Sequence, residues 1–202
     1  MLNETNKKPE IIVFAGPNGS GKSTITRMLR PGNMPYVNAD EIQRALECEP
    51  LEAAQIAEGR REDYVKAKKS FSFETVLSTD RNLNLLKKAK EAGYFIRCFY
   101  VVTVSPEINV ARVRARVAAG GHDVPIEKIY SRYDNALALV PEVVAVCDVC
   151  HIYDNSADRP FRIFKKRKDL CWYSTKANYW RKEDIALLTG VSDATRANLN
   201  MR

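Results

Sequence analysis

The sequence Gly16-Pro-Asn-Gly-Ser-Gly-Lys-Ser23 has the form G-x-x-x-x-G-K-S, and the residues on either side give it a structural context. Before it, residues 11–15 (IIVFA) are an apolar run rich in β-branched side chains, as a strand buried on both faces requires. After it, residues 23–30 are good helix formers, and Pro31-Gly32 ends that pattern. A strand, a glycine-rich loop and a helix in this order predict a phosphate-binding P-loop.

The residue types of the loop fit this role. Glycines let the backbone turn tightly and direct several N–H groups inward, and the helix N-terminus adds partial positive charge. Lys22 is predicted to reach the β- and γ-phosphates of a nucleoside triphosphate, and Ser23 to ligate Mg²⁺. The predicted nucleotide-binding residues are Gly16, Pro17, Asn18, Gly19, Ser20, Gly21, Lys22, Ser23 and Thr24.

The composition indicates one globular α/β unit. The chain has 202 residues, 45% of them hydrophobic, which suffices for one well-buried domain with a small appendage. We expect the P-loop domain over residues 1–158 and a basic hairpin and helix over residues 159–202, in the same unit. No apolar run approaches the ~20 residues of a membrane span, and residues 1–10 lack the apolar core of a signal peptide. We therefore expect a cytoplasmic protein with free thiols at its five cysteines.

The positive charge is concentrated in the tail. From Arg159 onward there are eleven Lys and Arg against four Asp and Glu, so this segment carries the whole net charge of +7. One interpretation is a surface for nucleic acid or an acidic partner. We favour a solvated hairpin and helix, because the run Lys165-Lys-Arg-Lys168 is short and lies at a predicted turn. The pattern then predicts a last helix over residues 180–188 and an irregular end over residues 191–202.

Asp40 follows a predicted strand over residues 35–38 and precedes a helical pattern over residues 41–46. One interpretation is that Asp40 caps this helix. The other uses its place at the carboxyl end of a strand, where the ligands of open α/β folds gather. There a carboxylate could be the general base that takes a proton from an acceptor hydroxyl. The sequence leaves both roles open, and one residue could fill both.

Glu74 is a carboxylate inside an aromatic and β-branched strand pattern over residues 71–77, which follows a helical segment over residues 50–69. On the solvated face of an edge strand it would need no explanation. In a central strand of a parallel sheet an unpaired carboxylate is costly, so it should face a polar ligand or a cation. We favour a place for Glu74 in the site.

Two arginines flank a glycine-rich loop later in the chain. Pro106 begins a predicted helix that contains Arg116, and the loop Gly120-Gly-His-Asp-Val-Pro125 leads to a second helix that contains Arg132 and extends to Val140. This pattern predicts a helical lid whose arginines neutralise the charge of a transferring phosphoryl group. The alternative is a surface hairpin with solvated arginines, and the presence of the P-loop favours the lid.

The sequence Cys147-x-x-Cys150-His151 matches the attachment pattern of c-type haem. We reject haem because its attachment needs export, for which residues 1–10 show no signal. We also reject a metal site, because His122 is the only other histidine. Half-buried cysteines in a last core strand over residues 147–154 are the better interpretation.

Several motifs together resemble the zeta-toxin-like P-loop kinases, over roughly residues 11–156. They are GPNGSGKST, NADEI, FETVLST, RVAAGGHDVP, RYDNAL and YDNS. The resemblance implies an α/β P-loop kinase fold, a mainly parallel sheet flanked by helices. It also implies an ATP- and Mg²⁺-dependent transfer of a phosphoryl group to a sugar hydroxyl of UDP-N-acetylglucosamine. An antitoxin is implied as a candidate partner, because toxic members of the family pair with one.

The resemblance also implies roles for individual residues. Asp40 would be the base, and Lys22 would clamp the phosphates together with Arg116 and Arg132. Near the acceptor, it would place Asp40, Glu74 and Thr75. No apolar strand ends in a recognisable Walker B aspartate, so Ser23 alone is assigned to Mg²⁺. The GGHDVP loop is typical of the toxin-like branch, whose acceptors need not be the toxin's.

The sequence therefore predicts an ATP-dependent kinase for a small-molecule hydroxyl, with UDP-N-acetylglucosamine as the first choice of acceptor. One alternative is another small-molecule or nucleotide kinase of similar build. Another is a regulatory, non-catalytic ATP-binding module that acts through the basic tail. We expect neither nucleic acid nor a membrane among the partners.

Overall fold

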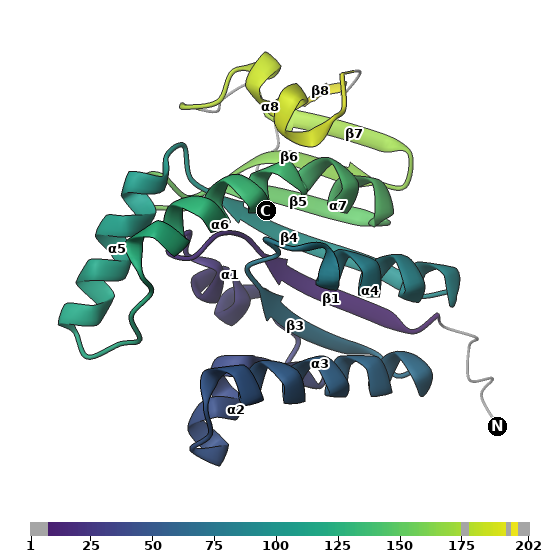
Figure 1. Cartoon of the computed structure of the whole chain (residues 1–202). Coiled ribbons are helices and arrows are strands. Elements are labelled where there is room, and N and C mark those ends of the chain that lie inside the picture. Colours follow the sequence, from purple (N-terminus) through teal and green to yellow (C-terminus); the bar gives the residue numbers. More distant parts are fainter. Residues whose placement is uncertain (1–7, 175–177, 193–194, 198–202) are drawn as a thin grey trace.

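A sheet of eight strands in the order β2-β3-β1-β4-β5-β6-β7-β8 forms the centre of the computed structural model (Figure 1). The structure describes residues 8–174, 178–192 and 195–197. Neighbouring strands run parallel from β2 to β5, which confirms the mainly parallel sheet flanked by helices. The strands are β1 (Glu10–Ala15), β2 (Tyr36–Val37), β3 (Phe71–Thr75), β4 (Phe95–Val102), β5 (Val149–Asp154), β6 (Phe161–Arg167), β7 (Leu170–Ser174) and β8 (Thr195–Ala197).

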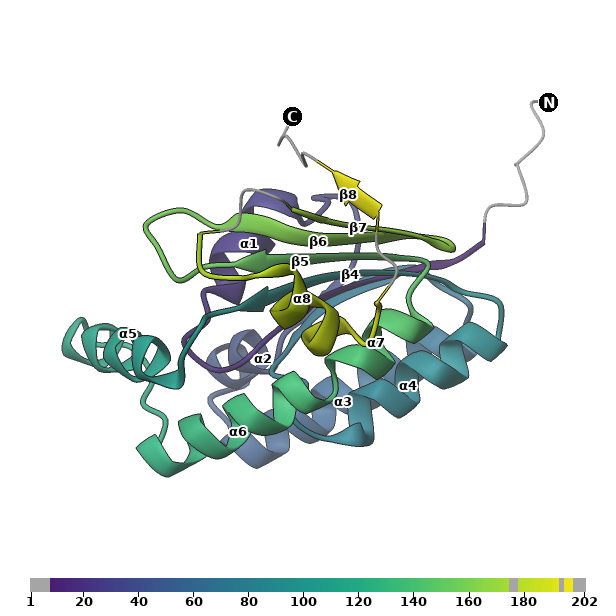
Figure 2. The same ribbon diagram turned by 90° about the horizontal axis from the view of Figure 1, so that it is seen from above.

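Helices cover the two faces of the sheet unequally. One face packs on α1, and the other packs on a row that includes α3, α4, α6 and α7 (Figure 2). None of the helices in the described part of the chain is long and apolar enough to cross a membrane. The helices are α1 (Lys22–Leu29), α2 (Ala39–Leu46), α3 (Pro50–Lys66), α4 (Asp80–Glu91), α5 (Pro106–Ala118), α6 (Ile126–Ala138), α7 (Val140–Val146) and α8 (Lys182–Thr189).

The core follows from the alternation of side chains along the central strands. On β1, Ile11 and Val13 point toward the helix-rich face, while Ile12 and Phe14 point toward α1 and meet Ile25 there. All four β1 side chains are at most 4% exposed, as expected of a strand covered on both faces. Burying each such side chain contributes roughly 1.5–3 kcal/mol. This packing fixes the carboxyl end of β1, where the P-loop begins.

Two differences from the sequence prediction add an element to the fold. The second lid helix does not extend to Val140, because α6 ends at Ala138 and α7 begins at Val140 with a proline in its first turn. Proline has no N–H to donate and suits a helix start, so it favours a new helix here. The end of the chain was predicted to be irregular, but its residues Thr195–Ala197 form β8 beside β7. The rest of residues 193–202 lies outside the described part.

The basic tail extends the sheet. Strands β6 and β7 form the predicted antiparallel hairpin, and β6 pairs antiparallel with β5. The predicted last helix is present as α8, which packs on α7 through Ile185 and Leu188. All five cysteines are free thiols, as predicted.

Candidate active site

The P-loop joins the end of β1 to the start of α1 and uses glycines where no side chain fits. Gly16 has φ 140°, and a Cβ there would lie 2.1 Å from the carbonyl oxygen of Val101 on the neighbouring strand β4. Gly21 has φ 93°, and a Cβ there would lie 2.1 Å from Nδ2 of Asn155. Both positions combine a left-handed backbone with a close approach, which other residues tolerate poorly. The loop is therefore held tightly against the ends of β4 and β5.

Lys22 is the buried cation of the site. Its side chain is 9% exposed, and Nζ donates a hydrogen bond to the carbonyl oxygen of Pro17, 2.9 Å away. Burial lowers the pKa of Lys22, Glu74 and Asp40 raise it, and Arg116 and Arg132 lower it further. A desolvated ammonium gains most from an anion placed beside it. The P-loop therefore fits a phosphate group.

The charged residues that influence the pKa of Lys22 come from distant parts of the sequence. Asp40 follows β2, Glu74 ends β3, Arg116 is on α5 and Arg132 is on α6. All the charged residues that the sequence assigned to the site therefore lie within electrostatic range of one lysine. Two carboxylates and three cations at the carboxyl edge of a parallel sheet can bind phosphate and metal together.

Glu74 points to α1 and accepts hydrogen bonds from three hydroxyls. The donors are Ser23 Oγ at 2.9 Å, Thr26 Oγ1 at 2.8 Å and Tyr36 Oη at 3.3 Å. The alternative of a solvated edge carboxylate is therefore wrong. A carboxylate and a serine hydroxyl this close, beside a phosphate site, are the oxygen ligands that Mg²⁺ takes in nucleotide enzymes. Thr26 and Tyr36 were not identified from the sequence, because only the fold brings them to Glu74.

Asp40 does not cap α2, so that interpretation is wrong. Asn38 is the capping residue, and its Oδ1 accepts from the backbone N–H groups of Asp40 at 2.8 Å and Glu41 at 3.3 Å. The helix begins at Ala39, which places Asp40 inside the first turn. Among the described residues, the exposed carboxylate of Asp40 has no hydrogen-bond or ion-pair partner. It is free to face a ligand.

Asn38 also connects the capped turn to Glu74. Its Nδ2 donates to Tyr36 Oη at 2.8 Å, and Tyr36 in turn donates to Glu74. Burial raises the pKa of Tyr36, and the Glu74 charge raises it further, so the phenol stays protonated as a donor. One hydrogen-bonded chain therefore fixes the Glu74 carboxylate relative to the turn that carries Asp40.

Thr75 ends β3 and shapes the turn after it. Its Oγ1 accepts from the Leu77 N–H at 3.0 Å and from Asn82 Nδ2 at 2.9 Å. Leu77 has φ 55°, so this turn has a left-handed residue that the Thr75 hydroxyl helps to hold. Thr75 is half-buried beside Glu74.

The hairpin of α5 and α6 has a small apolar cluster of its own, formed by Val110, Val113, Val124 and Ile129. Arg132 on α6 donates to Asn18 Oδ1 of the P-loop at 3.5 Å. Arg116 on α5 donates to the carbonyl oxygen of His122 at 2.7 Å, within the glycine-rich loop. One arginine therefore contacts the P-loop while the other is held by the connecting loop.

A polar cavity of about 360 Å³ adjoins the P-loop. It lies between the start of α1 and the segment after β5, and its lining includes Gly21, Thr24, Arg112, Asn155 and Pro160. Asn155 is 9% exposed, and its Nδ2 donates to the Ser20 carbonyl oxygen at 2.7 Å. Arg112 donates to the Ala157 carbonyl oxygen at 3.4 Å, and its Nη1 has no partner among the described residues. The sequence motif YDNS contains Asn155, but the spacing alone gave it no role.

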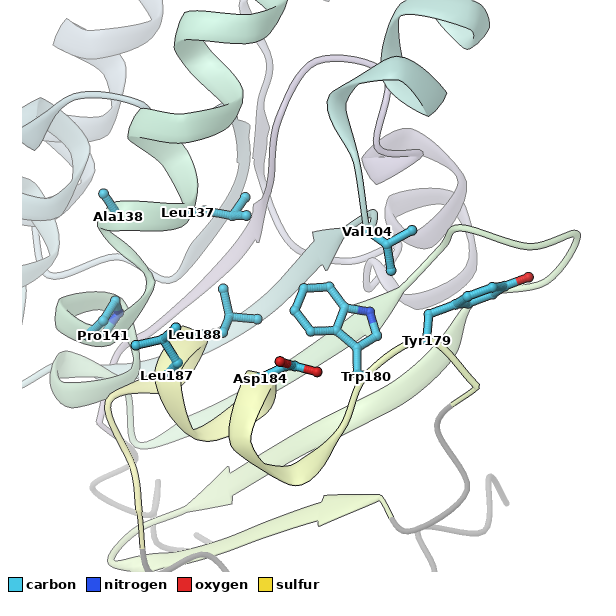
Figure 3. Close-up of a pocket in the computed structure, with 9 residues that line it drawn as sticks. All are labelled: Val104, Leu137, Ala138, Pro141, Tyr179, Trp180, Asp184, Leu187 and Leu188. Carbon is cyan, nitrogen blue, oxygen red and sulfur yellow. The ribbon is translucent and has the colours of Figure 1, made fainter.

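A second cavity, of about 530 Å³, lies away from the P-loop between the end of β4, the α6–α7 junction and α8 (Figure 3). Figure 3 shows Val104, Leu137 and Leu188 around it, with the Trp180 ring on one side and the Asp184 carboxylate nearby. Its lining is mainly apolar and includes none of the phosphate-site residues. We therefore place the chemistry at the P-loop.

Comparisons with known proteins bear on the family and the fold of the chain. The family model described as zeta toxin matches residues 2–169. An uncharacterized protein of Haemophilus influenzae is 31% identical over 127 residues, which are 60% of this chain and 91% of that protein.

Solved structures share the fold at lower identity. A chain from the PezAT chromosomal toxin-antitoxin system of Streptococcus pneumoniae gives a TM-score of 0.56 at 21% identity, covering 81% of this chain and 74% of that one. A chain from AvrRxo1-ORF1:AvrRxo1-ORF2 with sulphate ions gives 0.69 at 13% identity, covering 93% and 64%. At these identities the likeness concerns the fold alone.

Proposed function

The chain belongs to the zeta toxin family, and on that basis we propose that it transfers the γ-phosphoryl group of ATP to a hydroxyl of a small-molecule acceptor. The observation that carries the proposal is the convergence of Asp40, Glu74 and the two lid arginines on the buried Lys22. Phosphoryl transfer depends mainly on positioning and on neutralising charge, and this set of groups supplies both.

The nucleotide would be held along the P-loop. The backbone N–H groups and Lys22 would bind the β- and γ-phosphates, and the polar cavity beside Thr24 and Arg112 would accept the nucleoside. Ser23 and Glu74 would hold Mg²⁺, which supplies charge neutralisation at the phosphate oxygens when bound. Glu74 would thereby fill the place for which the sequence offered no Walker B aspartate.

Asp40 would act on the acceptor. Its carboxylate is exposed, within electrostatic reach of Lys22, and unpartnered among the described residues, so an acceptor hydroxyl can approach it. There it would orient the hydroxyl and accept its proton as the new P–O bond forms. Arg116 and Arg132 would face the three equatorial oxygens of the transferring group, whose charge is greatest in the transition state.

The acceptor is the least constrained part of the proposal. Family membership makes UDP-N-acetylglucosamine the first compound to test, with Thr75 and Glu74 near its binding place. Another small-molecule or nucleotide acceptor, and a non-catalytic ATP-binding module, are the competing functions. The PezAT relative comes from a toxin-antitoxin system, which supports an antitoxin as a partner to test. We further propose that the protein acts in the cytoplasm.

Substitution of Asp40 separates these functions. Asp40→Asn keeps the size of the side chain and removes the proton acceptor, so we expect ATP binding to persist while transfer falls by ~10²–10⁴. Transfer would be measured with labelled ATP against a panel of sugar nucleotides, nucleosides and small alcohols. Glu41→Gln changes the neighbouring exposed carboxylate of the same helical turn and should leave transfer unchanged.

Two results would contradict the proposal. Wild-type turnover in Asp40→Asn would remove Asp40 from the chemistry. Absence of transfer by the unmodified protein to every acceptor, together with tight ATP binding, would favour the regulatory module.

A further inference from the structure

The α1 side of the sheet is only partly covered. Helix α1 packs chiefly on β1, β3 and β4, while the helix row that includes α4 and α7 lies on the opposite side. In Figure 1, α1 lies level with β1 and β4 rather than with β6 and β7. On that side, Tyr153 of β5 is 7% exposed and packs in the α1 cluster, whereas β6 and β7 present a partly exposed face.

Strand register places cationic and aromatic side chains together on this face. Phe99, His151, Lys165 and Trp172 are direct partners across four adjacent strands, so they point to the same side. We call the partly exposed portion of this surface the open face, and its residues are His151, Arg162, Lys165, Arg167 and Trp172.

The side chains of β6 alternate between the two faces of the sheet, so the basic run of residues 165–168 does more than keep the chain soluble. Lys166 points to the helix-covered side, where Nζ donates to the carbonyl oxygens of Val144 at 2.6 Å and Ala145 at 3.0 Å. It thereby stabilises the C-terminal end of α7. Lys165 and Arg167 point the other way, onto the open face. The run that appears uniform in the sequence is thus divided between two functions.

The cations of the open face lack acidic partners. Arg162, Lys165 and Arg167 form no ion pair with any described residue, and the buried Nε of Arg162 has no hydrogen-bond acceptor there. Arg162 Nη1 lies 3.4 Å from His151 Nδ1. Burial, followed by the charges of Arg162, Lys165 and Arg97, lowers the pKa of His151 to about 4. The face is therefore electropositive, because no acidic group of the described residues balances its cations.

Aromatic rings lie among these cations. The His151 ring stacks on Phe99 with 5.3 Å between centroids, and Tyr153 lies 6.4 Å from His151 in a tilted arrangement. Lys165 Nζ lies 5.3 Å from the centroid of the half-buried Trp172 ring. Phe99 and Tyr153 are at most 9% exposed, so the half-buried Trp172 is the ring offered to a base. Proteins bind single strands with such rings beside Lys and Arg on a sheet, because bases stack on rings while cations meet phosphates.

We propose that the open face binds single-stranded nucleic acid, with Arg162, Lys165 and Arg167 contacting phosphates and Trp172 contacting a base. Three strands spaced by ~4.8 Å give room for about two or three nucleotides. An acidic peptide would meet the same cations but would leave the rings without stacking partners. The proposal is independent of phosphoryl transfer, since none of these side chains belongs to the P-loop site.

The test measures binding of a fluorescein-labelled oligouridylate of about 12 nucleotides by fluorescence anisotropy. Arg162→Glu with Lys165→Glu should weaken binding by at least ~10-fold, because it reverses two phosphate contacts. The matched control, Lys69→Glu with Lys88→Glu, makes the same change in net charge at exposed lysines near α3 and α4, on the covered side. This control should keep most of the affinity, and ATP binding should be unchanged in both.

Two further measurements keep the proposal testable if the double variant does not fold. Lys165→Gln should reduce the slope of log affinity against log salt by about 0.7. In a Trp180→Phe background, where Trp172 is the remaining tryptophan, the oligonucleotide should quench fluorescence and polyglutamate should not.

The proposal is overturned by any of three results. One is an equal loss of affinity in the control variant. Another is competition by polyglutamate as strong as that by the oligonucleotide, which would assign the face to an acidic protein. The third is the absence of measurable binding at low salt.

Discussion

The environment of Glu74 turns an ordinary strand carboxylate into a candidate metal ligand. Three hydroxyls donate to it, and the nearest belong to Ser23 and Thr26 on the first turns of α1. A carboxylate in that position adds negative charge beside Lys22 and offers oxygen at the edge of the phosphate site. Its contribution should therefore depend on Mg²⁺.

We expect Glu74→Gln to raise the Mg²⁺ concentration for half-maximal transfer by at least ~10-fold, since neutral amide oxygens bind Mg²⁺ more weakly than carboxylates. Glutamine keeps the length of the side chain and can still accept from Ser23 and Thr26. Titration of turnover with Mg²⁺ measures the effect, with Glu91→Gln at the exposed end of α4 as the control. An unchanged Mg²⁺ requirement would show that Glu74 does not serve the metal.

The roles of single residues were predictable where a motif fixes them. They were less predictable where a shift of one or two positions changes the role. The P-loop glycines and Lys22 follow from spacing alone. The sequence left capping open as one of two roles for Asp40, whereas Asn38 is the cap, because a sequence pattern does not place a helix start to within one or two residues. The partners of Glu74 were also hidden, since Tyr36 lies 38 residues away in sequence.

At the scale of elements, the α5–α6 hairpin is a separate packing unit beside the sheet. Its own cluster, which includes Val113 and Ile129, keeps the two helices together. Its arginines reach the site in different ways, since Arg132 contacts Asn18 whereas Arg116 is held by the His122 carbonyl. The glycine-rich loop and the flanking arginines were enough to predict the hairpin, but not which arginine meets the P-loop.

We expect Arg132→Ala to lower the rate of transfer at saturating substrates by ~10³–10⁵, with a much smaller change in ATP affinity. The reason is that a guanidinium facing the transferring phosphoryl group interacts most strongly in the transition state. Single-turnover kinetics and calorimetry separate the two effects. Arg114→Ala, an exposed arginine of the same hairpin, is the control and should behave as wild type. Near-normal turnover in Arg132→Ala would assign the hairpin to another purpose.

Element boundaries depended on local chemistry that the periodic pattern did not resolve. The apolar spacing from Ile126 to Val140 fits one helix, yet Pro141 starts a new one at α7. In the basic run of β6, likewise, only the register with β5 shows which side chains point to each face of the sheet. Period and composition predict that an element exists, whereas its partners decide which face each side chain occupies.

At the scale of the whole molecule, the parallel core was predictable and the arrangement of its edge was not. Buried apolar runs and the P-loop predict a mainly parallel sheet, because such strands need cover on both faces. Nothing local in residues 161–174 shows that this hairpin pairs with β5, or that its far side stays uncovered by helices. Those features result from contacts distant in sequence, and they create the open face.

The outermost strand allows a last prediction about how much of this sheet the active site needs. Strand β8 pairs only with β7 among the described strands, whereas the cavity beside the P-loop is lined no later in the chain than Pro160. We therefore expect deletion of residues 191–202 to leave transfer unchanged and to lower the melting temperature modestly, because it uncovers the edge of β7. Deletion from residue 159 onward would instead remove Ile163 and Phe164, both 0% exposed, and should prevent folding.

Turnover and circular dichroism of the shorter deletion decide the matter. If that protein keeps its helix and strand signal but loses transfer, the end of the chain completes the acceptor site or an active assembly, and the P-loop edge of the sheet is not sufficient for the reaction.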